Sequence, residues 1–272
     1  MIKSKHKHSV LISFDVEEFD LPREHGAEIS LAEGVGVSSA GVERILELLE
    51  RCEVKATFFV TGNFASLMPE LVLRMVREGH EVGCHGVDHF KPRKTDVLES
   101  KKIIEGVVRR EFPNFEAKGW RQPRMFEIDY GELLRRGFLY DSSVNPALIP
   151  GRYNHLDVPR KPFLKEGIVE VPVSVASFLR VPLFWLALHL YPVGLYTRLA
   201  RMSLKETGYF ATYFHPWEFS DELMKYGAVP AYIKRNSGAK MVARLEKVIL
   251  ALKKQGCEFE TYREFADRVK LN

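Results

Sequence analysis

Short apolar runs alternate with amphipathic stretches along most of the chain. Residues 9–14 and 55–60 are rich in β-branched and aromatic side chains, which predicts strands. Between them, apolar side chains recur every three or four positions from residue 39 to residue 51, which predicts a helix with one buried face. A strand, a helix and a second strand in this order are typical of a parallel βαβ unit.

The alternation continues toward the C-terminus. A helix is expected to begin at Pro69 and to end before Gly79, since proline favours the first helical turn and glycine the helix end. Further helices are expected at residues 97–110, 130–136 and 239–254, and further strands at residues 81–84, 138–141, 168–172, 209–214 and 258–261. This pattern and a length of 272 residues predict an α/β fold, for which one barrel is an ordinary architecture.

One part of the chain departs from the alternation. The pattern is irregular at about residues 145–204, which we interpret as an insertion on a single domain that spans residues 1–272. We find no internal repeat, low-complexity tract or flexible linker that would mark a second domain.

Composition narrows the class of protein. Apolar residues make up 46% and charged residues 28% of the chain, the profile of a soluble globular protein. The net charge is only +4, and Lys and Arg are spread along the chain, so no nucleic-acid partner is expected. Three widely spaced cysteines favour reduced thiols over a disulfide framework.

Two apolar segments bear on location. The basic first eight residues run directly into the apolar segment 9–14, which is too short for a signal peptide, so a cytoplasmic protein is expected. Residues 181–196 are also apolar, but they are fewer than a bilayer span needs and include His189 and Pro192, which argues against a transmembrane helix. Two interpretations stay open for them: a buried pair of helices, or a segment that contacts lipid or covers the substrate.

Polar residues follow the expected strands. In a barrel the chemistry gathers at the carboxyl ends of the strands, where the loops begin. A single charged residue after a strand is usually just solvated, but several residues able to do acid–base or metal chemistry favour one shared site. The residues at these positions are Asp15, His85, Arg121, Asp141 and His215.

A metal site is the chemistry that two short segments suggest. His85 and His89 lie four residues apart, on the same side of a predicted helical turn, and neutral imidazoles are good zinc ligands. Asp15 and Glu17 lie two residues apart, so in an extended segment one could bind a metal while the other acts as a base. The alternatives are a structural histidine pair and a solvated acidic loop.

His215 is the other strong candidate. It closes an expected strand and is followed by Pro216, which fixes the turn, and by Trp217. A histidine held in this way suits a positioned general acid, although a satisfied core histidine is the alternative.

Five separated segments share a pattern with one known family. They are residues 13–18 (SFDVEE), 85–89 (HGVDH), 121–124 (RQPR), 140–143 (YDSS) and 213–218 (YFHPWE). In this order they resemble the motifs of the polysaccharide deacetylases of the NodB-homology type, carbohydrate esterase family 4. The Asp-Val-Glu and His-Pro-Trp-Glu variants resemble a bacterial subgroup that takes part in surface-polysaccharide and O-antigen assembly.

The resemblance implies a fold, a metal and a set of catalytic residues. The fold would be a distorted (β/α)7 or (β/α)8 barrel, and the cofactor a divalent metal, which we expect to be Zn²⁺. Val16 occupies the place of the family's usual metal-binding aspartate, so we assign Glu17 as the acidic ligand, with Glu18 as a lesser possibility. The implied roles of the others are metal ligands for His85 and His89, general base for Asp15, its ion-pair partner for Arg121, general acid for His215, and support of His215 or Arg121 for Asp141.

Substrate contacts are expected from three places. The backbone N–H of Arg124 would hold the oxyanion, and three aromatic side chains would either stack on sugar faces or pack at the barrel rim. The irregular segment supplies a candidate substrate loop. The aromatic residues are Trp120, Trp217 and Tyr213, and the loop residues are Arg152, Tyr153 and Asn154.

The resemblance therefore predicts hydrolytic removal of an N-acetyl group from a sugar or glycan intermediate of cell-surface polysaccharide synthesis. The partner would be a carbohydrate, including a membrane-associated lipid-linked glycan; the sequence leaves the oligomeric state open. Two alternatives remain. One is a metal-independent amidohydrolase that acts on a small cyclic amide, and the other is a catalytically silent carbohydrate-binding barrel.

Overall fold

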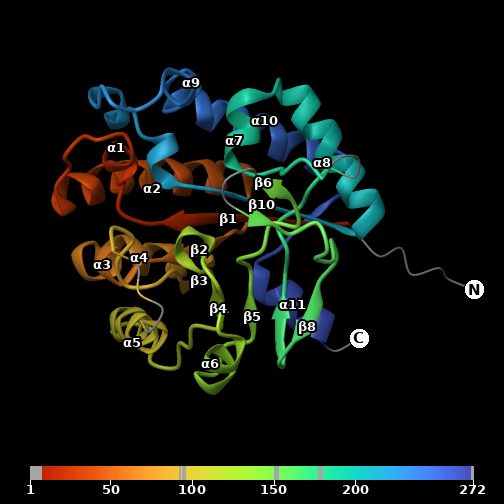
Figure 1. Ribbon diagram of the computed structural model, residues 1–272, viewed down its shortest axis with the longest axis horizontal. Coiled ribbons are helices and arrows are strands. Elements are labelled where there is room, and N and C mark those ends of the chain that lie inside the picture. The colour runs from red at the N-terminus through yellow and green to blue at the C-terminus, as the bar shows by residue number, and fades with distance from the viewer. Residues whose placement is uncertain (1–7, 92, 94–95, 150–152, 177–179, 271–272) are drawn as a thin grey trace, which may run out of the picture.

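The architecture is a curled, mostly parallel sheet. A computed structural model of the chain describes residues 8–91, 93, 96–149, 153–176 and 180–270. The sheet has the strand order β10-β1-β2-β3-β4-β5-β9-β8, so its parallel strands follow one another in chain order around the curl (Figure 1). The strands on this path are β1 (Ser9–Val16), β2 (Thr57–Val60), β3 (Glu81–Cys84), β4 (Gly119–Trp120), β5 (Tyr140–Asp141), β9 (Ile168–Glu170), β8 (Phe163–Lys165) and β10 (Tyr209–Phe214).

The two ends of the curled sheet approach each other. The chain leaves β9 and runs beside β10, where the Ser174 N–H donates to the Ala211 carbonyl at 2.9 Å. The Ala211 N–H in turn donates to Ser174 Oγ at 2.9 Å. The expected distorted barrel of seven or eight strands is therefore confirmed: among the described residues, seven parallel strands lie on the path from β10 to β9, and one further parallel strand, β11 (Glu258–Phe259), pairs with β1.

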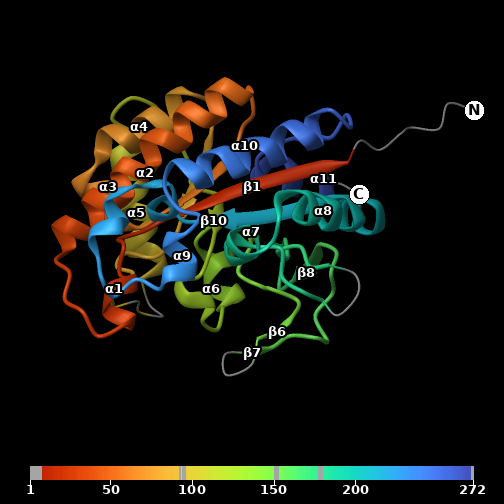
Figure 2. The same cartoon turned by 90° about the horizontal axis from the view of Figure 1, so that it is seen from above.

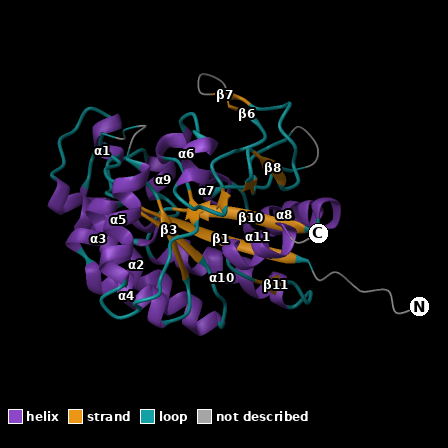
Figure 3. Cartoon of the chain, turned by 90° about the horizontal axis from the view of Figure 1, so that it is seen from below, coloured by secondary structure: helices purple, strands orange, loops and turns teal. Residues whose placement is uncertain are grey.

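Helices cover the outside of the sheet (Figure 3). The capping box of Ser30 and Glu33 begins the helix α2, and its apolar stripe faces the strands. The helices α2, α10 and α8 pack side by side, as do α3, α4 and α5. The helices are α1 (Leu21–Glu24), α2 (Leu31–Cys52), α3 (Gly62–Leu67), α4 (Pro69–Arg77), α5 (Val97–Val108), α6 (Tyr130–Arg135), α7 (Trp185–Leu190), α8 (Val193–Thr207), α9 (Ala231–Lys234), α10 (Ala239–Lys253) and α11 (Tyr262–Lys270), with 3-10 turns η1 (Pro123–Met125), η2 (Pro216–Phe219) and η3 (Glu222–Lys225).

The irregular segment 145–204 contains small elements and two helices. The hairpin of β6 (Leu148–Ile149) and β7 (Tyr153–Asn154) projects to one side of the barrel (Figure 2). β8 pairs antiparallel with β9, and the short helix α7 leads to α8. None of the helices of the described chain has the length and hydropathy of a membrane span.

The barrel interior is built in layers because β1 alternates strictly. Val10, Ile12 and Phe14 point to the outer helices and belong to the main apolar core. The other face of β1 carries Leu11 near the amino end, where an apolar layer with Phe59, Tyr140, Tyr209, Tyr262 and Phe265 fills the barrel. The strand β11 (Glu258–Phe259) pairs with β1 and leads to α11, which closes this end. Ser13, and then Asp15, follow Leu11 toward the carboxyl ends of the strands.

Candidate metal and catalytic site

Three buried side chains meet at the carboxyl end of β1 and β3. The ligand atoms of Glu17, His85 and His89 all lie within 4.8 Å of one another. Glu17 Oε2 is 3.2 Å from His85 Nε2 and 2.9 Å from His89 Nε2. Two imidazoles and one carboxylate that converge in this way form the donor set of a zinc-type divalent cation with an open coordination position.

The two histidines converge through a loop and not through a helical turn. The expectation of a helical pair at residues 85–89 is wrong, because this segment has no helical structure. Gly86 adopts a left-handed φ of +73°, and a Cβ there would lie 2.7 Å from Pro123 Cγ. Glycine therefore lets the loop fold back tightly, and the imidazole rings stack with their centroids 5.7 Å apart.

Each imidazole is oriented by its other nitrogen. His85 Nδ1 lies 2.9 Å from the Arg121 carbonyl oxygen, and His89 Nδ1 lies 3.2 Å from Asp20 Oδ2. Both contacts require a proton on Nδ1, so each ring would offer the lone pair of its Nε2 to a bound cation. Sequence reasoning missed Asp20, although it lies in the same acidic segment as Glu17.

The charges of the cluster shift its proton affinities. Burial alone would raise the pKa of Glu17, but the charges of His89 and His215 and the hydrogen bonds from both ligand histidines hold it well below its usual value. Burial alone would lower the pKa of His89, whereas Glu17 and Asp20 raise it to about 10. A cation bound here must therefore displace the proton shared within this cluster.

The expected ion pair between Arg121 and Asp15 is present at 2.7 Å. The Arg121 side chain is fully buried, and its Nη1 also donates to Ser13 Oγ at 2.8 Å. Nε and Nη2 donate to the carbonyl and hydroxyl oxygens of Ser142 at 2.7 and 2.9 Å, and Nη2 reaches Tyr262 Oη at 3.4 Å. All five N–H groups of the guanidinium are thereby used, so the Asp15 carboxylate is held in a fixed orientation.

The carboxylate of Asp141 forms hydrogen bonds within its own loop. Its carboxylate accepts hydrogen bonds from the Ser143 hydroxyl at 2.6 Å and the Ser143 N–H at 3.0 Å. Beside it lies Glu170, which accepts from Tyr130 Oη at 3.1 Å. Burial raises the pKa of both carboxyl groups. Asp141 therefore shapes the loop that carries Ser142, and the charge of Arg121 acts on its carboxyl group, so its support of Arg121 or His215 stays a prediction.

Glu218 supports His215. Glu218 Oε1 lies 3.0 Å from His215 Nδ1 and accepts from the His215 backbone N–H at 2.6 Å. His215 Nε2 then points toward the metal cluster, 3.9 Å from Glu17 Oε1. Burial alone would lower the pKa of His215, but Glu17 and Glu218 raise it above its usual value. One signal in the sequence could have indicated this pair. Glu218 follows His215 by three residues, across a turn that begins at Pro216.

Arg124 contributes through its side chain as well as its backbone. Its guanidinium forms ion pairs with Asp20 and, at 2.6 Å, with Glu24 of α1. Because Asp20 also accepts from His89 Nδ1, Arg124 links α1 to this ligand histidine. Its backbone has a φ of 54°, a conformation that is rare for residues other than glycine and frequent at functional sites. Glu18 lies outside the cation cluster, because its carboxylate accepts from Thr61 Oγ1 and from the His89 N–H, both at 3.2 Å.

The three aromatic residues expected at the substrate are all buried by packing. Trp120 is 0% exposed and donates its Nε1–H to Gln122 Oε1 at 3.2 Å. Trp217 is stacked on the His215 ring at 5.0 Å, and Tyr213 on the Phe184 ring at 5.7 Å. Of the two interpretations, the burial of all three side chains favours packing within the barrel over stacking on a sugar.

The expected substrate loop is only partly described. Arg152 lies outside the described residues, as does the side chain of Tyr153, and Asn154 is exposed on β7. The half-buried aromatic ring nearest to the acid belongs to Trp185 of α7, with its centroid 5.4 Å from that of His215. Sequence reasoning missed Trp185 because it lies where the strand–helix alternation is lost.

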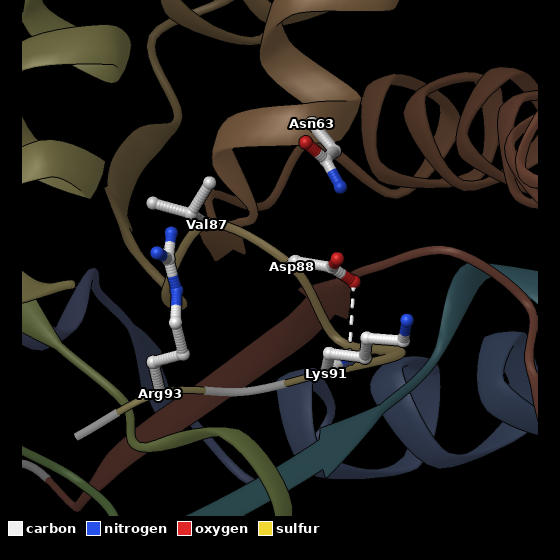
Figure 4. A pocket seen from close by; sticks show the side chains of 5 residues that line it. All are labelled: Asn63, Val87, Asp88, Lys91 and Arg93. Atoms are coloured by element: carbon white, nitrogen blue, oxygen red, sulfur yellow. Dashed lines mark hydrogen bonds between the residues drawn. The ribbon is translucent and has the colours of Figure 1, made fainter. Parts of the chain in front are cut away.

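A hollow of about 610 Å³ adjoins the loop of residues 85–89, which carries the two ligand histidines (Figure 4). Val87 and Asp88, which line it, lie between the two ligand histidines in the chain. Asp88 accepts a hydrogen bond from the backbone N–H of Lys91, so its carboxylate is engaged within the loop. The residues that line the hollow are Asn63, Val87, Asp88, Lys91 and Arg93.

Known proteins of similar sequence include two deacetylases. The chain is 29% identical to the peptidoglycan deacetylase of Helicobacter pylori over 121 residues, which cover 42% of this chain and 40% of that protein. It is 49% identical to the chitooligosaccharide deacetylase of a Bradyrhizobium strain over 153 residues, which cover 55% of this chain and 65% of that protein. The matched region thus spans less than two thirds of either relative.

A solved structure shows the same fold over almost the whole chain. A putative polysaccharide deacetylase from Mycobacterium smegmatis superposes with a TM-score of 0.66 and 19% identity, over 98% of this chain and 92% of that one. Residues 142–267 match a family described as a domain of unknown function. Residues 3–138, half of the chain, match the family described as polysaccharide deacetylase. This chain therefore belongs to the polysaccharide deacetylase family.

Proposed function

We propose that this protein is a metal-dependent deacetylase that hydrolyses the N-acetyl group of a carbohydrate. The observation that carries the proposal is the convergence of Glu17, His85 and His89 beside Asp15 and His215 at one mouth of the barrel. The two relatives named above are deacetylases of peptidoglycan and of chitooligosaccharides, which supports an N-acetylated glycan as the substrate class.

Glu17, His85 and His89 would hold the metal, and their donor set suits Zn²⁺. When bound, such a cation polarises an amide carbonyl and lowers the pKa of water. Asp15 accepts the proton of the attacking water, and the hydrogen bond from Arg121 fixes the orientation of that carboxylate. The backbone N–H of Arg124, presented by a left-handed turn, donates to the developing oxyanion.

His215 completes the reaction as the general acid. Its Nδ1 is held by Glu218, so that Nε2 faces the cluster and delivers a proton to the leaving amine. Glu17 and Glu218 raise the pKa of His215, which favours the protonated ring that a general acid requires. Asp15 as the base and His215 as the acid would thus form the acid–base pair that acts on the scissile amide.

We further propose that the substrate is a cytoplasmic intermediate of surface-glycan synthesis, including a lipid-linked glycan. The support is the resemblance of the Asp-Val-Glu and His-Pro-Trp-Glu segments to the subgroup active in surface-polysaccharide and O-antigen assembly. A panel of free chitooligosaccharides, peptidoglycan fragments and lipid-linked N-acetylated saccharides separates these classes by their relative kcat/KM values.

Acetate release is the direct test of the activity. The zinc-loaded protein should release acetate from at least one member of the panel, whereas the variants Asp15→Asn and His215→Ala should lose at least about 100-fold in kcat with the fold intact. Full turnover by both variants would contradict the proposal.

The same assay separates the alternatives. Undiminished turnover after complete removal of metal would support a metal-independent amidohydrolase acting on a cyclic amide. Saturable glycan binding without any acetate release would support a silent carbohydrate-binding barrel.

A further inference from the structure

The short helix α7 carries a buried histidine that lies outside all five motifs. His189 Nε2 is 2.9 Å from Glu218 Oε2, and both side chains are completely buried. The other oxygen of the same carboxylate is 3.0 Å from His215 Nδ1. One carboxylate therefore bridges two imidazoles, one of them in the proposed general acid.

The second nitrogen of His189 fixes its tautomer. Nδ1 is buried and has no hydrogen-bond partner among the described residues. A proton on Nδ1 would be a buried donor without an acceptor, and the lone pair on Nε2 would then face a carboxylate oxygen. The proton of a neutral His189 therefore lies on Nε2, which donates to Glu218.

The rest of α7 is anchored to the turn after α9 and to α10. The Asn236 side-chain N–H donates to the His189 carbonyl at 2.6 Å, and the Arg244 guanidinium donates to the Leu188 carbonyl at 2.8 and 3.0 Å. Trp185, one turn before His189 on the same helix, packs edge-on against the His215 ring. The helix α7 thus contacts His215 directly through Trp185, and through His189 by way of the Glu218 carboxylate.

We propose that His189 is a positioning residue for His215. By donating to Glu218 Oε2, it fixes the carboxylate so that Oε1 receives the Nδ1–H of His215 and the Nε2 of that ring faces the cluster. Without His189, one oxygen of Glu218 would be buried without a partner, and the carboxylate could rotate away from His215. The role in turnover rests on the proposed deacetylase function, but the orientation of the three side chains does not.

Kinetic comparison of two substitutions tests the proposal. His189→Leu should lower kcat by about 10- to 100-fold with KM within about twofold, because the lost interaction acts on the acid and not on substrate binding. His189→Gln should recover kcat to within about threefold of the unmodified protein, since its amide N–H reaches the place of Nε2. Leu190→Gln, at an exposed position of the same helix, is the matched control and should leave kcat unchanged.

Unchanged kcat in His189→Leu would overturn the proposal. An equal loss in the Gln and Leu variants at equal melting temperatures would also overturn it, because a merely structural role does not distinguish the two side chains.

A second measurement needs no activity. Imidazole ¹⁵N spectra of the zinc-loaded protein should show His189 protonated on Nε2, and the Nδ1–H signal of His215 should shift or broaden in His189→Leu. A His189 protonated on Nδ1, or a His215 signal that is indifferent to the substitution, would contradict the arrangement. If the unmodified protein releases no acetate, the proposed function fails, and these spectra still decide the role of His189.

Discussion

At the scale of single residues, the site consists of buried charges that are almost all paired. Asp15 is paired with Arg121, Glu17 lies between two histidines, and Glu218 lies between two others. A buried charge is costly unless its partners remain in place. Removing one member should therefore harm stability as well as activity, and removing both members of a pair should cost less than the sum.

Arg121 offers the clearest case. Arg121→Met should lower the free energy of unfolding by about 3–5 kcal/mol, because Asp15 is left buried without its counter-charge. The double variant Asp15→Asn with Arg121→Met should be more stable than Arg121→Met alone. Urea unfolding followed by circular dichroism measures both values. An Arg121→Met variant within about 0.5 kcal/mol of the original, the range of an inconsequential surface change, would contradict the buried pair.

Gly86 is predicted to control the metal site through the backbone. Gly86→Ala must strain a φ of +73° and press a Cβ against Pro123, so the two ligand histidines should separate and zinc affinity should fall by about 10-fold or more. Gly26→Ala is a matched control, because Gly26 has a φ of +76° but open space around it. Calorimetric zinc titration compares the two; equal affinities would show that the tight turn does not position the ligands.

At the scale of elements, the sequence predicted the regular parts well. The expected strands at residues 81–84 and 209–214 coincide with β3 and β10, and the expected first strand lies within β1. The pair of helices held open for residues 181–196 is present as α7 and the start of α8. The continuation of α8 to Thr207 and the helix α11 were not expected. α8 lies in the segment judged irregular, and α11 has a weakly apolar sequence whose few apolar residues fill the barrel end.

The site was predictable where strands end and less so where orientation depends on tertiary contacts. Glu17, His85, His89 and His215 meet as expected, because the carboxyl ends of parallel strands share one edge. Trp120 could not be oriented, because a two-residue strand shows no alternation from which to read its face. The partners of the histidines depend on loop geometry, which apolar periodicity does not encode.

The connection between α4 and β3 predicts a pH effect. Burial, and then the charge of Lys55, lower the pKa of His80 to about 4, whereas an unfolded histidine titrates near 6.5. Between these values the unfolded chain binds the proton and the folded chain does not, so stability falls as the pH drops from about 6.5 to 4. His80→Asn keeps an acceptor for the Ala56 N–H and should remove about 2–3 kcal/mol of this loss.

Urea unfolding at pH 7 and pH 4.5 provides the comparison. Because carboxylates titrate equally in both proteins, the difference between their pH slopes isolates His80. Identical slopes would show that His80 is not held neutral in the folded chain.

At the scale of the whole molecule, the barrel joins two halves that match different families. The boundary between residues 138 and 142 lies at β5, which pairs with β4 on one side and β9 on the other. The proposed metal ligands come from the first half and the proposed acid from the second. Side chains of both halves also fill the barrel interior, where the apolar layer around Leu11 lies below the ion pair of Arg121 and Asp15.

A fragment of residues 1–138 should therefore fail to fold. In the fragment β1 would lose its partner strand β10, β4 would lose its partner strand β5, and Arg121 would lose its acceptors on Ser142. Circular dichroism of the fragment should show no cooperative melting, whereas the full chain should unfold in one transition by both circular dichroism and tryptophan fluorescence. A cooperatively melting fragment that binds zinc would contradict a single folding unit.

The central claim is that side chains distant in the chain gather around one divalent cation. A crystal structure of the zinc-loaded protein, with anomalous diffraction measured across the zinc absorption edge, tests it most directly. One strong anomalous peak is expected about 2.0–2.2 Å from an oxygen of Glu17 and from Nε2 of His85 and His89, with Asp15 and His215 facing it. A peak elsewhere, or an empty cluster at saturating zinc, would contradict it.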